Sequence, residues 1–169
     1  IRGCGVSMPF KEACIALVDE LDASAAAIQS INTIVNTHGH LKAYNTDYIA
    51  IAQLLETHAV PKDSTFALRG SGGMAKAVAS ALRDGGYKNG LIVARNERAG
   101  QALADSLGYR WQAELGEERP QMLINVTPVG MDGGPEAGQL AFEPEVIQAA
   151  GIVFDVVAIP SETPLIVRG

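Results

Sequence analysis

A cluster of glycines follows directly on an apolar, strand-like run and could hold the phosphates of a nucleotide. The pattern Gly70-x-Gly72-x-x-Ala75 comes immediately after residues 65–69. In a strand–turn–helix unit the first glycine makes the tight turn, and the second lets the backbone approach a pyrophosphate. The helix N-terminus then offers N–H groups and a positive dipole end to the phosphates. The predicted phosphate-binding residues are Gly70, Ser71, Gly72, Gly73 and Met74, although a ligand-free turn of small residues has the same pattern.

The next strand-like run ends in a basic residue where many nucleotide sites carry an acidic one. It reads Leu91-Ile-Val-Ala94-Arg95-Asn96. NAD-binding units usually have Asp or Glu here to accept hydrogen bonds from the ribose hydroxyls, whereas NADP-binding units often have Arg. A guanidinium can meet the 2′-phosphate in a forked, charge-assisted contact. Arg95, with Arg98 nearby, therefore favours NADP over NAD, although a solvated arginine beside Glu97 would look the same.

Three polar groups interrupt apolar surroundings in the first 60 residues. They are Lys11 at the end of Val6-Ser-Met-Pro-Phe-Lys11, then Asn32-Thr33, and then Asn45-Thr46-Asp47. Each has an ordinary explanation: a solvated lysine, a turn-forming asparagine, and an aspartate that caps a helix. Taken singly, none of them requires a function.

The elements that must position these groups follow from hydrophobic periodicity and turn residues. The turn Asn36-Thr37-His38-Gly39 predicts a hairpin, and Thr46 or Asp47 is the natural N-cap of the next helix. Pro61 marks the best domain boundary, which separates a domain of residues 1–60 from one of 61–169. In the first domain we predict a strand and loop at 1–9, helices at 11–21 and 23–29, and hairpin strands at 33–35 and 41–44.

Strands and helices alternate in the second domain. Short connections in such a pattern predict parallel strands with helices on both faces. The fold class is therefore α/β, with a Rossmann-type nucleotide-binding domain that follows a smaller, partial α/β domain. We predict strands at 65–69, 90–94, 109–112, 122–126 and 152–157, and helices at 73–84, 97–107 and 144–150.

The polar motifs, taken in order, resemble those of the shikimate dehydrogenase family. Ser7-Met-Pro-Phe-Lys11 is similar to the family's Val-Thr-x-Pro-x-Lys signature, with Ser7 in place of Thr. The other matches are Asn32-Thr33, Asn45-Thr46-Asp47, Gly70-Ser-Gly-Gly-Met-Ala-Lys-Ala77, Ile124-Asn-Val-Thr-Pro-Val-Gly-Met131 and Thr163-Pro164-Leu165. Six motifs in the same order over nearly the whole chain argue against chance similarity.

The resemblance implies NADP-dependent interconversion of 3-dehydroshikimate and shikimate, or of a related polyhydroxy cyclic acid such as quinate. Hydride delivered to a ketone carbon leaves an alkoxide, which needs a proton or a cation. Lys11 would lie beside that oxygen, as a proton donor or only as a stabilising charge, and Asp47 would bind a ring hydroxyl and hold the ammonium. The substrate would lie in the cleft between the domains. The other implied contacts are Ser7 and Asn32 with substrate hydroxyls, and Ala94, Arg95, Asn96, Thr127 and Val156 with the cofactor.

The chain also departs from the family pattern. Ala158 stands where the family has a substrate-facing Tyr, Ala43 replaces the Gly of Gly-x-Asn-Thr-Asp, and Ala94 replaces the Asn of Asn-Arg-Thr. The family's paired serines and a substrate-binding Gln are expected to lie outside residues 1–169. This combination points to a paralogue with altered or weaker substrate use, or to a nucleotide-binding sensor without useful turnover.

Composition excludes several other classes of function. A net charge of −6 argues against a nucleic-acid partner. No apolar run approaches the roughly 18–20 residues that span a bilayer, and no signal peptide is visible, so we expect a cytoplasmic protein with a small-molecule substrate. Cys14 shares a predicted helical face with Leu17, Val18 and Leu21 and should pack there. His38-Gly-His40 has no third ligand nearby, so no metal site is expected.

Overall fold

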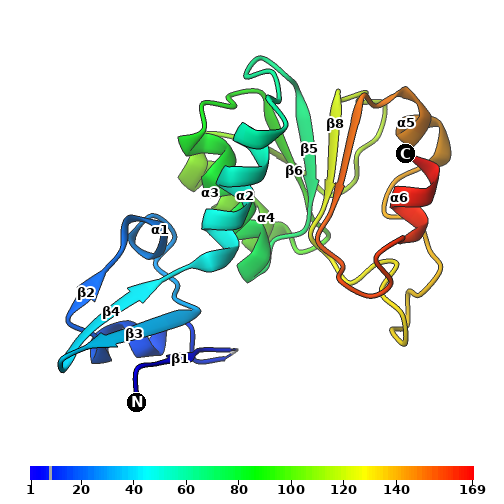
Figure 1. Cartoon of the computed structure of the whole chain (residues 1–169). Helices are drawn as coiled ribbons and strands as arrows, with labels where there is room; N and C mark the ends of the chain where they lie inside the picture. Colours follow the sequence, from blue (N-terminus) through cyan, green and yellow to red (C-terminus); the bar gives the residue numbers. More distant parts are fainter. Residues whose placement is uncertain (8) are drawn as a thin grey trace. The chain divides into compact units, whose positions relative to one another are not determined.

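The computed structural model describes residues 1–7 and 9–169, which divide into two compact units (Figure 1). The first unit comprises Ile1–Val60 and Lys76–Gly85, and the second comprises Pro61–Ala75 and Gly86–Gly169. Residues 76–85 thus group with the first unit, whereas the sequence placed them in the nucleotide domain. Met8 of the predicted lysine motif lies outside the described residues. In the part of the chain that is described, no helix is both long and apolar enough to cross a membrane.

The first unit contains a four-stranded sheet in the order β1-β3-β4-β2. Its strands are β1 (Gly3–Gly5), β2 (Glu20–Leu21), β3 (Thr33–Thr37) and β4 (His40–Tyr44). The predicted hairpin is confirmed, since β3 and β4 pair antiparallel from Thr33↔Tyr44 to Thr37↔His40. His38 and Gly39 form its turn with φ values of 53° and 94°. Positive φ at both central positions is the requirement of a type I′ hairpin turn.

The predicted helix at 11–21 is wrong in type and length. Only a 3-10 helix, η1 (Ala13–Leu17), forms, and the chain then extends into β2, which pairs parallel with Lys42 and Ala43 of β4. Pairing with an existing strand outweighs the local helical pattern, and Asp19 reinforces it by accepting a hydrogen bond from Leu41 N at 2.7 Å. Leu17, expected to be buried, is 70% exposed. The predicted packing of Cys14 is confirmed, since Cys14, Val18 and Leu21 pack on a core of Ala25, Ile31 and Ala43.

Two helices of this unit also differ from prediction at their ends. Helix α1 (Ala23–Ala26) is shorter than the predicted 23–29. Helix α2 (Thr46–Thr57) is capped by Asn45, whose side chain accepts from Tyr48 N, and not by Thr46 or Asp47. Asn45 is 2% exposed, and its amide also donates to Ser30 O at 3.1 Å. A buried cap residue therefore ties the start of α2 to the preceding chain.

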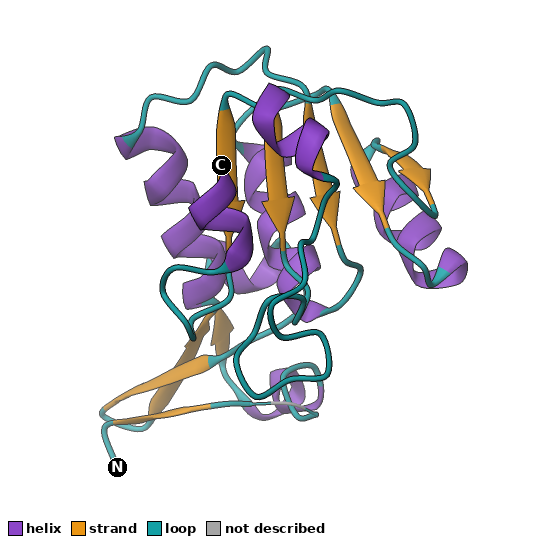
Figure 2. Cartoon of the chain, turned by 90° about the vertical axis from the view of Figure 1, so that its right-hand side faces the viewer, coloured by secondary structure: helices purple, strands orange, loops and turns teal. Residues whose placement is uncertain are grey.

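The second unit contains a five-stranded parallel sheet in the order β7-β6-β5-β8-β9, in which every arrow points the same way (Figure 2). Each predicted strand and helix of this region is present within a few residues, and α6 was not predicted. The strand order reverses at β5, and ligands of such sheets bind at the carboxyl ends beside that reversal. Residues 61–169 contain β5 (Phe66–Arg69), α3 (Gly73–Asp84), β6 (Gly90–Val93), α4 (Glu97–Leu107), β7 (Arg110–Gln112), β8 (Met122–Asn125), α5 (Pro144–Ala149), β9 (Ile152–Asp155) and α6 (Pro164–Arg168). From Lys76 onward, α3 groups with the first unit.

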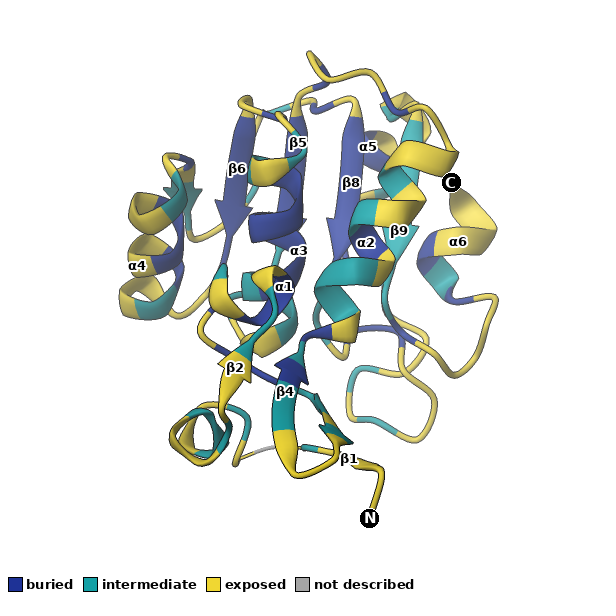
Figure 3. Cartoon of the chain, turned by 60° about the vertical axis from the view of Figure 1, so that its left-hand side comes forward, coloured by how far each residue is buried: buried dark blue, intermediate teal, exposed yellow. Residues whose placement is uncertain are grey.

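The central strands of this sheet are buried, as the dark blue of β5, β6 and β8 in Figure 3 shows. One face carries Ala67, Leu91 and Leu123, which pack against Val146 and Ile147 of α5 and Leu165 of α6. On the other face, Gly100 of α4 lies against Trp111 and Ala94, where a Cβ would collide. The edge strand β9, predicted as buried, is only half-buried because it has a neighbour on one side.

A tyrosine on α2 is tied to the last residue of α3 within the first unit. Tyr48 Oη donates to Asp84 Oδ2 at 2.6 Å. Burial, and secondarily this bond, raise the pKa of Tyr48 to about 12. Because an unfolded tyrosine titrates near a pKa of about 10, the contact stabilises the fold below that pH and is lost as the pH rises towards 12.

We therefore expect Tyr48 to ionise late in an absorbance titration of the phenolate band. Tyr48→Phe should lower the amplitude of the late step by one tyrosine, because the phenol that donates to Asp84 is gone. Tyr44→Phe, the matched control in the same unit, should keep it. A late step of undiminished amplitude in Tyr48→Phe would contradict the contact.

Candidate catalytic pair and nucleotide cavity

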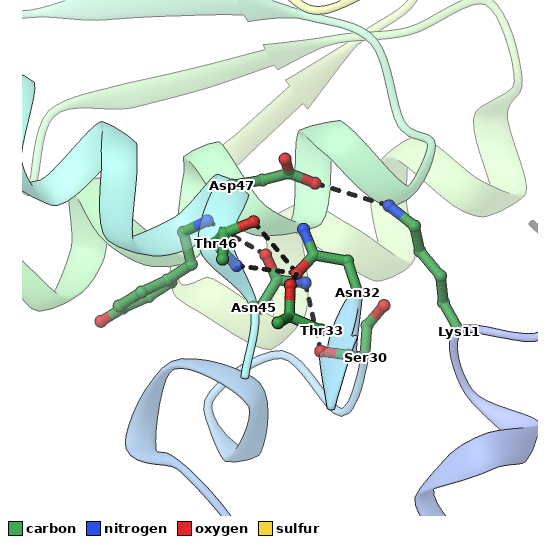
Figure 4. A network of polar contacts seen from close by, with 8 residues as sticks. Lys11, Ser30, Asn32, Thr33, Asn45, Thr46 and Asp47 are labelled. Carbon is green, nitrogen blue, oxygen red and sulfur yellow. Dashed lines mark hydrogen bonds and ion pairs between the residues drawn. The ribbon is translucent and has the colours of Figure 1, made fainter. Parts of the chain in front are cut away.

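Lys11 and Asp47 lie together, 36 residues apart in the chain (Figure 4). Lys11 Nζ donates to Asp47 Oδ2 at 3.4 Å, and the two side chains are 29% and 28% exposed. The backbone of Lys11 is also held, because its carbonyl accepts from Ile31 N at 2.9 Å. The predicted closeness of the ammonium and the carboxylate is confirmed. A half-buried ion pair of this kind could hold a cation beside a reacting oxygen and remain accessible to a ligand.

The start of α2 leaves the Asp47 carboxylate available for this pair. An aspartate at the beginning of a helix usually serves as the cap. Here Asn45 fills that position, so Asp47 lies in the first turn and its side chain is directed to Lys11. Asn45 N also donates to Ser24 Oγ at 3.1 Å, which fixes the backbone immediately before Asp47. Capping therefore does not explain the side-chain position of Asp47.

Asn32 is fixed beside this pair by three hydrogen bonds to one atom. Its Oδ1 accepts from Thr46 N at 2.9 Å, Thr46 Oγ1 at 3.1 Å and Thr33 Oγ1 at 3.0 Å. With the oxygen so occupied, the amide nitrogen must point away, and it donates to no group among residues 1–7 and 9–169. Ser7 is exposed, and its carbonyl accepts from Phe10 N. The side-chain NH2 of Asn32 is thus held in a fixed orientation and is available to donate a hydrogen bond to a ligand.

A cavity of about 240 Å³ lies at the carboxyl ends of β5 and β6 in the second unit. Six of the residues predicted to bind the cofactor line it, whereas Gly72, Gly73, Met74 and Val156 do not. Val156 N instead donates to Asn125 O at 3.1 Å, which continues the pairing of β8 and β9. The lining residues are Arg69, Gly70, Ser71, Val93, Ala94, Arg95, Asn96, Ala113, Thr127 and Val129.

The two glycines of the loop differ in what requires them. Gly70 has φ +131°, and a Cβ there would lie 2.8 Å from Val126 Cγ2. The backbone conformation and packing at position 70 therefore require glycine even without a ligand. Gly72 has no such φ, and within the described chain nothing lies within 4 Å of the place that a Cβ would take. Packing within the protein therefore does not require glycine at position 72. A phosphate that approached the backbone closely there would require it.

Known proteins resemble this chain both in sequence and in structure. Residues 1–34 match the family described as the shikimate dehydrogenase substrate binding domain. A shikimate dehydrogenase-like protein of Haemophilus influenzae is 51% identical over 166 residues, which cover 98% of this chain and 61% of that protein. The solved structure of a shikimate 5-dehydrogenase-like protein gives a TM-score of 0.97 at 50% identity, covering 99% of this chain and 62% of the other. This chain belongs to the shikimate dehydrogenase family.

A more distant member of the shikimate dehydrogenase family has the same fold. It is the shikimate 5-dehydrogenase of Thermus thermophilus in complex with NADP(H) and shikimate, with a TM-score of 0.86 at 28% identity. The match covers 99% of this chain and 63% of that one. The chain thus spans about three fifths of the length of these relatives. The family and the α/β fold predicted from the motifs are confirmed.

The structure gives different roles to the departures from the shikimate dehydrogenase pattern. Ala43 is fully buried and packs with Ala25 and Ile31, so it belongs to the core of the first unit. Ala94 lines the nucleotide cavity, and Ala158 is exposed after β9. The change from Gly to Ala at position 43 therefore affects the packing of the core. The change from Asn to Ala at position 94 alters a surface that a ligand would touch.

Sequence reasoning missed Arg69, a charged member of the cavity lining. Its guanidinium donates to Ala141 O and lies 6.0 Å from the centroid of the Phe142 ring. A signal was present, because Arg69 is a charged residue at the carboxyl end of an otherwise apolar strand. Parallel strands bring such ends to the edge where ligands bind.

Sequence reasoning also missed a buried polar network behind Thr127. Asn125, which is 0% exposed, donates to Val129 O at 3.1 Å and to Asp155 Oδ1 at 3.0 Å. Its Oδ1 accepts from Thr127 N at 3.1 Å and from Thr127 Oγ1 at 2.6 Å. The network fixes Thr127 and Val129, which line the cavity.

His40 of the hairpin lies beside two acidic side chains. His40 Nε2 lies 3.1 Å from Glu20 Oε2, and its Nδ1 lies 4.0 Å from Asp19 Oδ2. Among the residues that the structure describes, no three His, Cys, Asp or Glu side chains are grouped as metal ligands.

Proposed function

We propose that the protein is an NADP-dependent oxidoreductase that interconverts 3-dehydroshikimate and shikimate, or a closely related polyhydroxy cyclic acid. The observation that carries the proposal is the Lys11–Asp47 pair, in which the carboxylate is not used as a helix cap. Relatives named for this activity, one of them in complex with NADP(H) and shikimate, support it. The substrate-binding part is assigned to residues 1–60 and the cofactor-binding part to residues 61–169.

The residues present fit a nicotinamide nucleotide. Gly72 leaves the backbone open, and the cavity beside it offers Ser71 and Thr127 as polar groups. Arg95 supplies a cation at the end of the second strand, where a 2′-phosphate is recognised in sheets of this type. When bound, the nucleotide would supply the hydride. Gly70, Ser71, Gly72, Gly73 and Met74 would hold its phosphates, Ala94, Arg95 and Asn96 its ribose phosphate, and Thr127 and Val156 its nicotinamide end.

The role that we assign to Lys11 follows from the charge that develops on the substrate. A carbonyl oxygen becomes an alkoxide as its carbon is reduced, and an ammonium beside it stabilises that charge or donates the proton. Asp47 holds the ammonium in place and accepts from a ring hydroxyl. Asn32 offers its amide donor to a second substrate oxygen, and Ser7 a hydroxyl to another.

A turnover assay tests this function and separates it from a nucleotide-binding sensor. The full-length protein is incubated with NADP and shikimate or quinate, and the reduced cofactor is followed by absorbance. We expect oxidation of shikimate, and faster oxidation of quinate would assign the closely related activity. Nucleotide binding without turnover of either acid would contradict the enzyme and favour the sensor, which the exposed Ala158 would then explain.

Cofactor choice gives a further prediction. Arg95→Ala should remove most of a preference for NADPH over NADH, a loss of about 1–3 kcal/mol of binding free energy for a charge-assisted contact. Titrations of the native protein and the variant with both nucleotides measure it. Arg119→Ala is the matched control, because Arg119 is exposed and does not line the nucleotide cavity. Equal affinity of the native protein for both cofactors would contradict this prediction.

A further inference from the structure

A carboxylate from a distant segment lies beside the arginine that is expected to select the cofactor. Glu136 Oε1 is 3.7 Å from Arg95 Nη2, although the residues are 41 positions apart. The Arg95 side chain is 78% exposed, whereas that of Glu136 is 28% exposed. The carboxylate is thus the more buried partner, and Arg95 is one of the residues that line the nucleotide cavity.

The backbone around Glu136 is held in place by the loop that follows β8. Glu136 O accepts from Gly130 N at 3.0 Å and from Gln139 N at 3.2 Å. The far end of the same loop is tied to β5, because Arg69 donates to Ala141 O. Two arginines at the carboxyl ends of neighbouring strands therefore contact this loop, one through its backbone and one through Glu136.

The chemistry of the pair bears directly on a 2′-phosphate. Such a phosphate carries a charge of about −1.5 to −2 at neutral pH and seeks the guanidinium that Glu136 already contacts. A carboxylate close to the phosphate also disfavours it, because like charges repel. The 2′-hydroxyl of NAD is different, since it can donate a hydrogen bond to a carboxylate as it does in NAD-binding units.

We propose that Glu136 is a specificity-determining residue that weakens the preference of the cavity for NADP(H) over NAD(H). It supplies, from the loop after β8, the carboxylate that the end of β6 lacks. Arg95 favours the phosphate and Glu136 the hydroxyl, so the preference for NADP(H) is smaller than Arg95 alone would give. This inference rests on the proposed function, because it assumes that a nicotinamide nucleotide occupies the cavity.

Binding measurements on Glu136→Gln test the proposal, since this change removes the charge and keeps the size. The chain has one tryptophan, Trp111, whose Nε1 donates to the carbonyl of the cavity residue Ala94 at 3.2 Å. Its fluorescence is the readout for titrations with NADPH, NADH, 2′,5′-ADP and 5′-AMP. Neither 2′,5′-ADP nor 5′-AMP has a nicotinamide, and they differ only in the 2′-phosphate. Comparing their Kd values therefore measures the effect of the 2′-phosphate alone.

We expect Glu136→Gln to lower the Kd of NADPH and of 2′,5′-ADP about threefold to fivefold, the effect of one surface charge. The Kd values of NADH and 5′-AMP should stay within about twofold, because the Gln oxygen still accepts a hydrogen bond. Glu143→Gln is the matched control, because Glu143 is exposed and its side chain makes no cap bond to α5.

The outcomes separate the two proposals. An unchanged ratio of NADPH to NADH affinity in Glu136→Gln, with both nucleotides bound, would overturn the role of Glu136 and leave the proposed function intact. No binding of any of the four nucleotides to the native protein would overturn both. If Glu143→Gln raised the affinity for NADPH as much as Glu136→Gln does, the change in net charge alone would explain the effect. That result would also overturn the role of Glu136.

Discussion

Lys11→Met should lower turnover about 100-fold or more, the usual effect of removing a positioned acid or oxyanion stabiliser. The affinity for NADPH should stay nearly unchanged, because the residues that line the nucleotide cavity belong to the second unit. Asp47 would be left without the ammonium that it contacts at 3.4 Å. Steady-state rates and nucleotide titrations of the same preparation measure both quantities.

Lys42→Met is the matched control for this variant. Lys42 is also a partly exposed lysine of the first unit, and its Nζ lies 2.7 Å from Glu20 Oε1 on the neighbouring strand. It makes no contact with Asp47, so turnover should stay within about twofold of native, as for most surface substitutions. Full turnover in Lys11→Met, or an equal loss in Lys42→Met, would contradict the catalytic role of Lys11.

Asp47→Asn examines the other half of the pair. The amide keeps a hydrogen-bond acceptor at the start of α2 and removes only the charge that holds the ammonium. We expect turnover to fall and the KM of the substrate to rise, because the carboxylate is assigned both to Lys11 and to a ring hydroxyl. A thermal unfolding midpoint close to the native one would separate this loss from misfolding.

Asn125→Leu should lower the free energy of unfolding by about 3 kcal/mol, because it leaves buried partners unpaired. The side chain makes four hydrogen bonds to Thr127, Val129 and Asp155, and leucine of similar volume makes none. Urea unfolding of the variant and the native protein measures the difference. Nucleotide affinity should also fall, since Thr127 and Val129 line the cavity.

Asn89→Leu is the control for this second variant. Asn89 is exposed and donates a single hydrogen bond of 3.2 Å to Asp63 O. Its replacement should change the free energy of unfolding by no more than about 0.5 kcal/mol, as surface substitutions usually do. A loss in Asn125→Leu no larger than this would contradict the importance of the buried network.

The parallel sheet was predictable because its signals are local. Ala75, Val78 and Leu82 fall at helical spacing in the sequence, and all three are fully buried in α3. Apolar runs, glycine turns and amphipathic helices alternate over this half with short connections, and few arrangements of the chain satisfy that pattern. The hairpin turn at His38 and Gly39 was predictable for the same reason, since positive φ selects particular residues.

The first unit was less predictable because distant contacts override local preference there. Residues 11–21 have a helical pattern, yet Glu20 and Leu21 pair with Lys42 and Ala43, which lie 22 positions later. A local pattern contains no information about whether such a partner strand is available. The same limit applies to Glu136, whose meeting with Arg95 depends on the course of the loop after β8.

The α/β class, the glycine loop, the basic residue after β6 and, through the motifs, the family could all be inferred from local sequence patterns. Which of three adjacent polar residues caps α2 depends instead on contacts with distant parts of the chain. Asn45 does so because a buried amide there also bonds Ser30 O, and Asp47 is thereby left to Lys11. Capping preferences of Asn, Thr and Asp differ by too little to make that choice locally. The Lys11–Asp47 ion pair, on which the proposed chemistry rests, thus depends on how the start of α2 packs against the rest of the first unit.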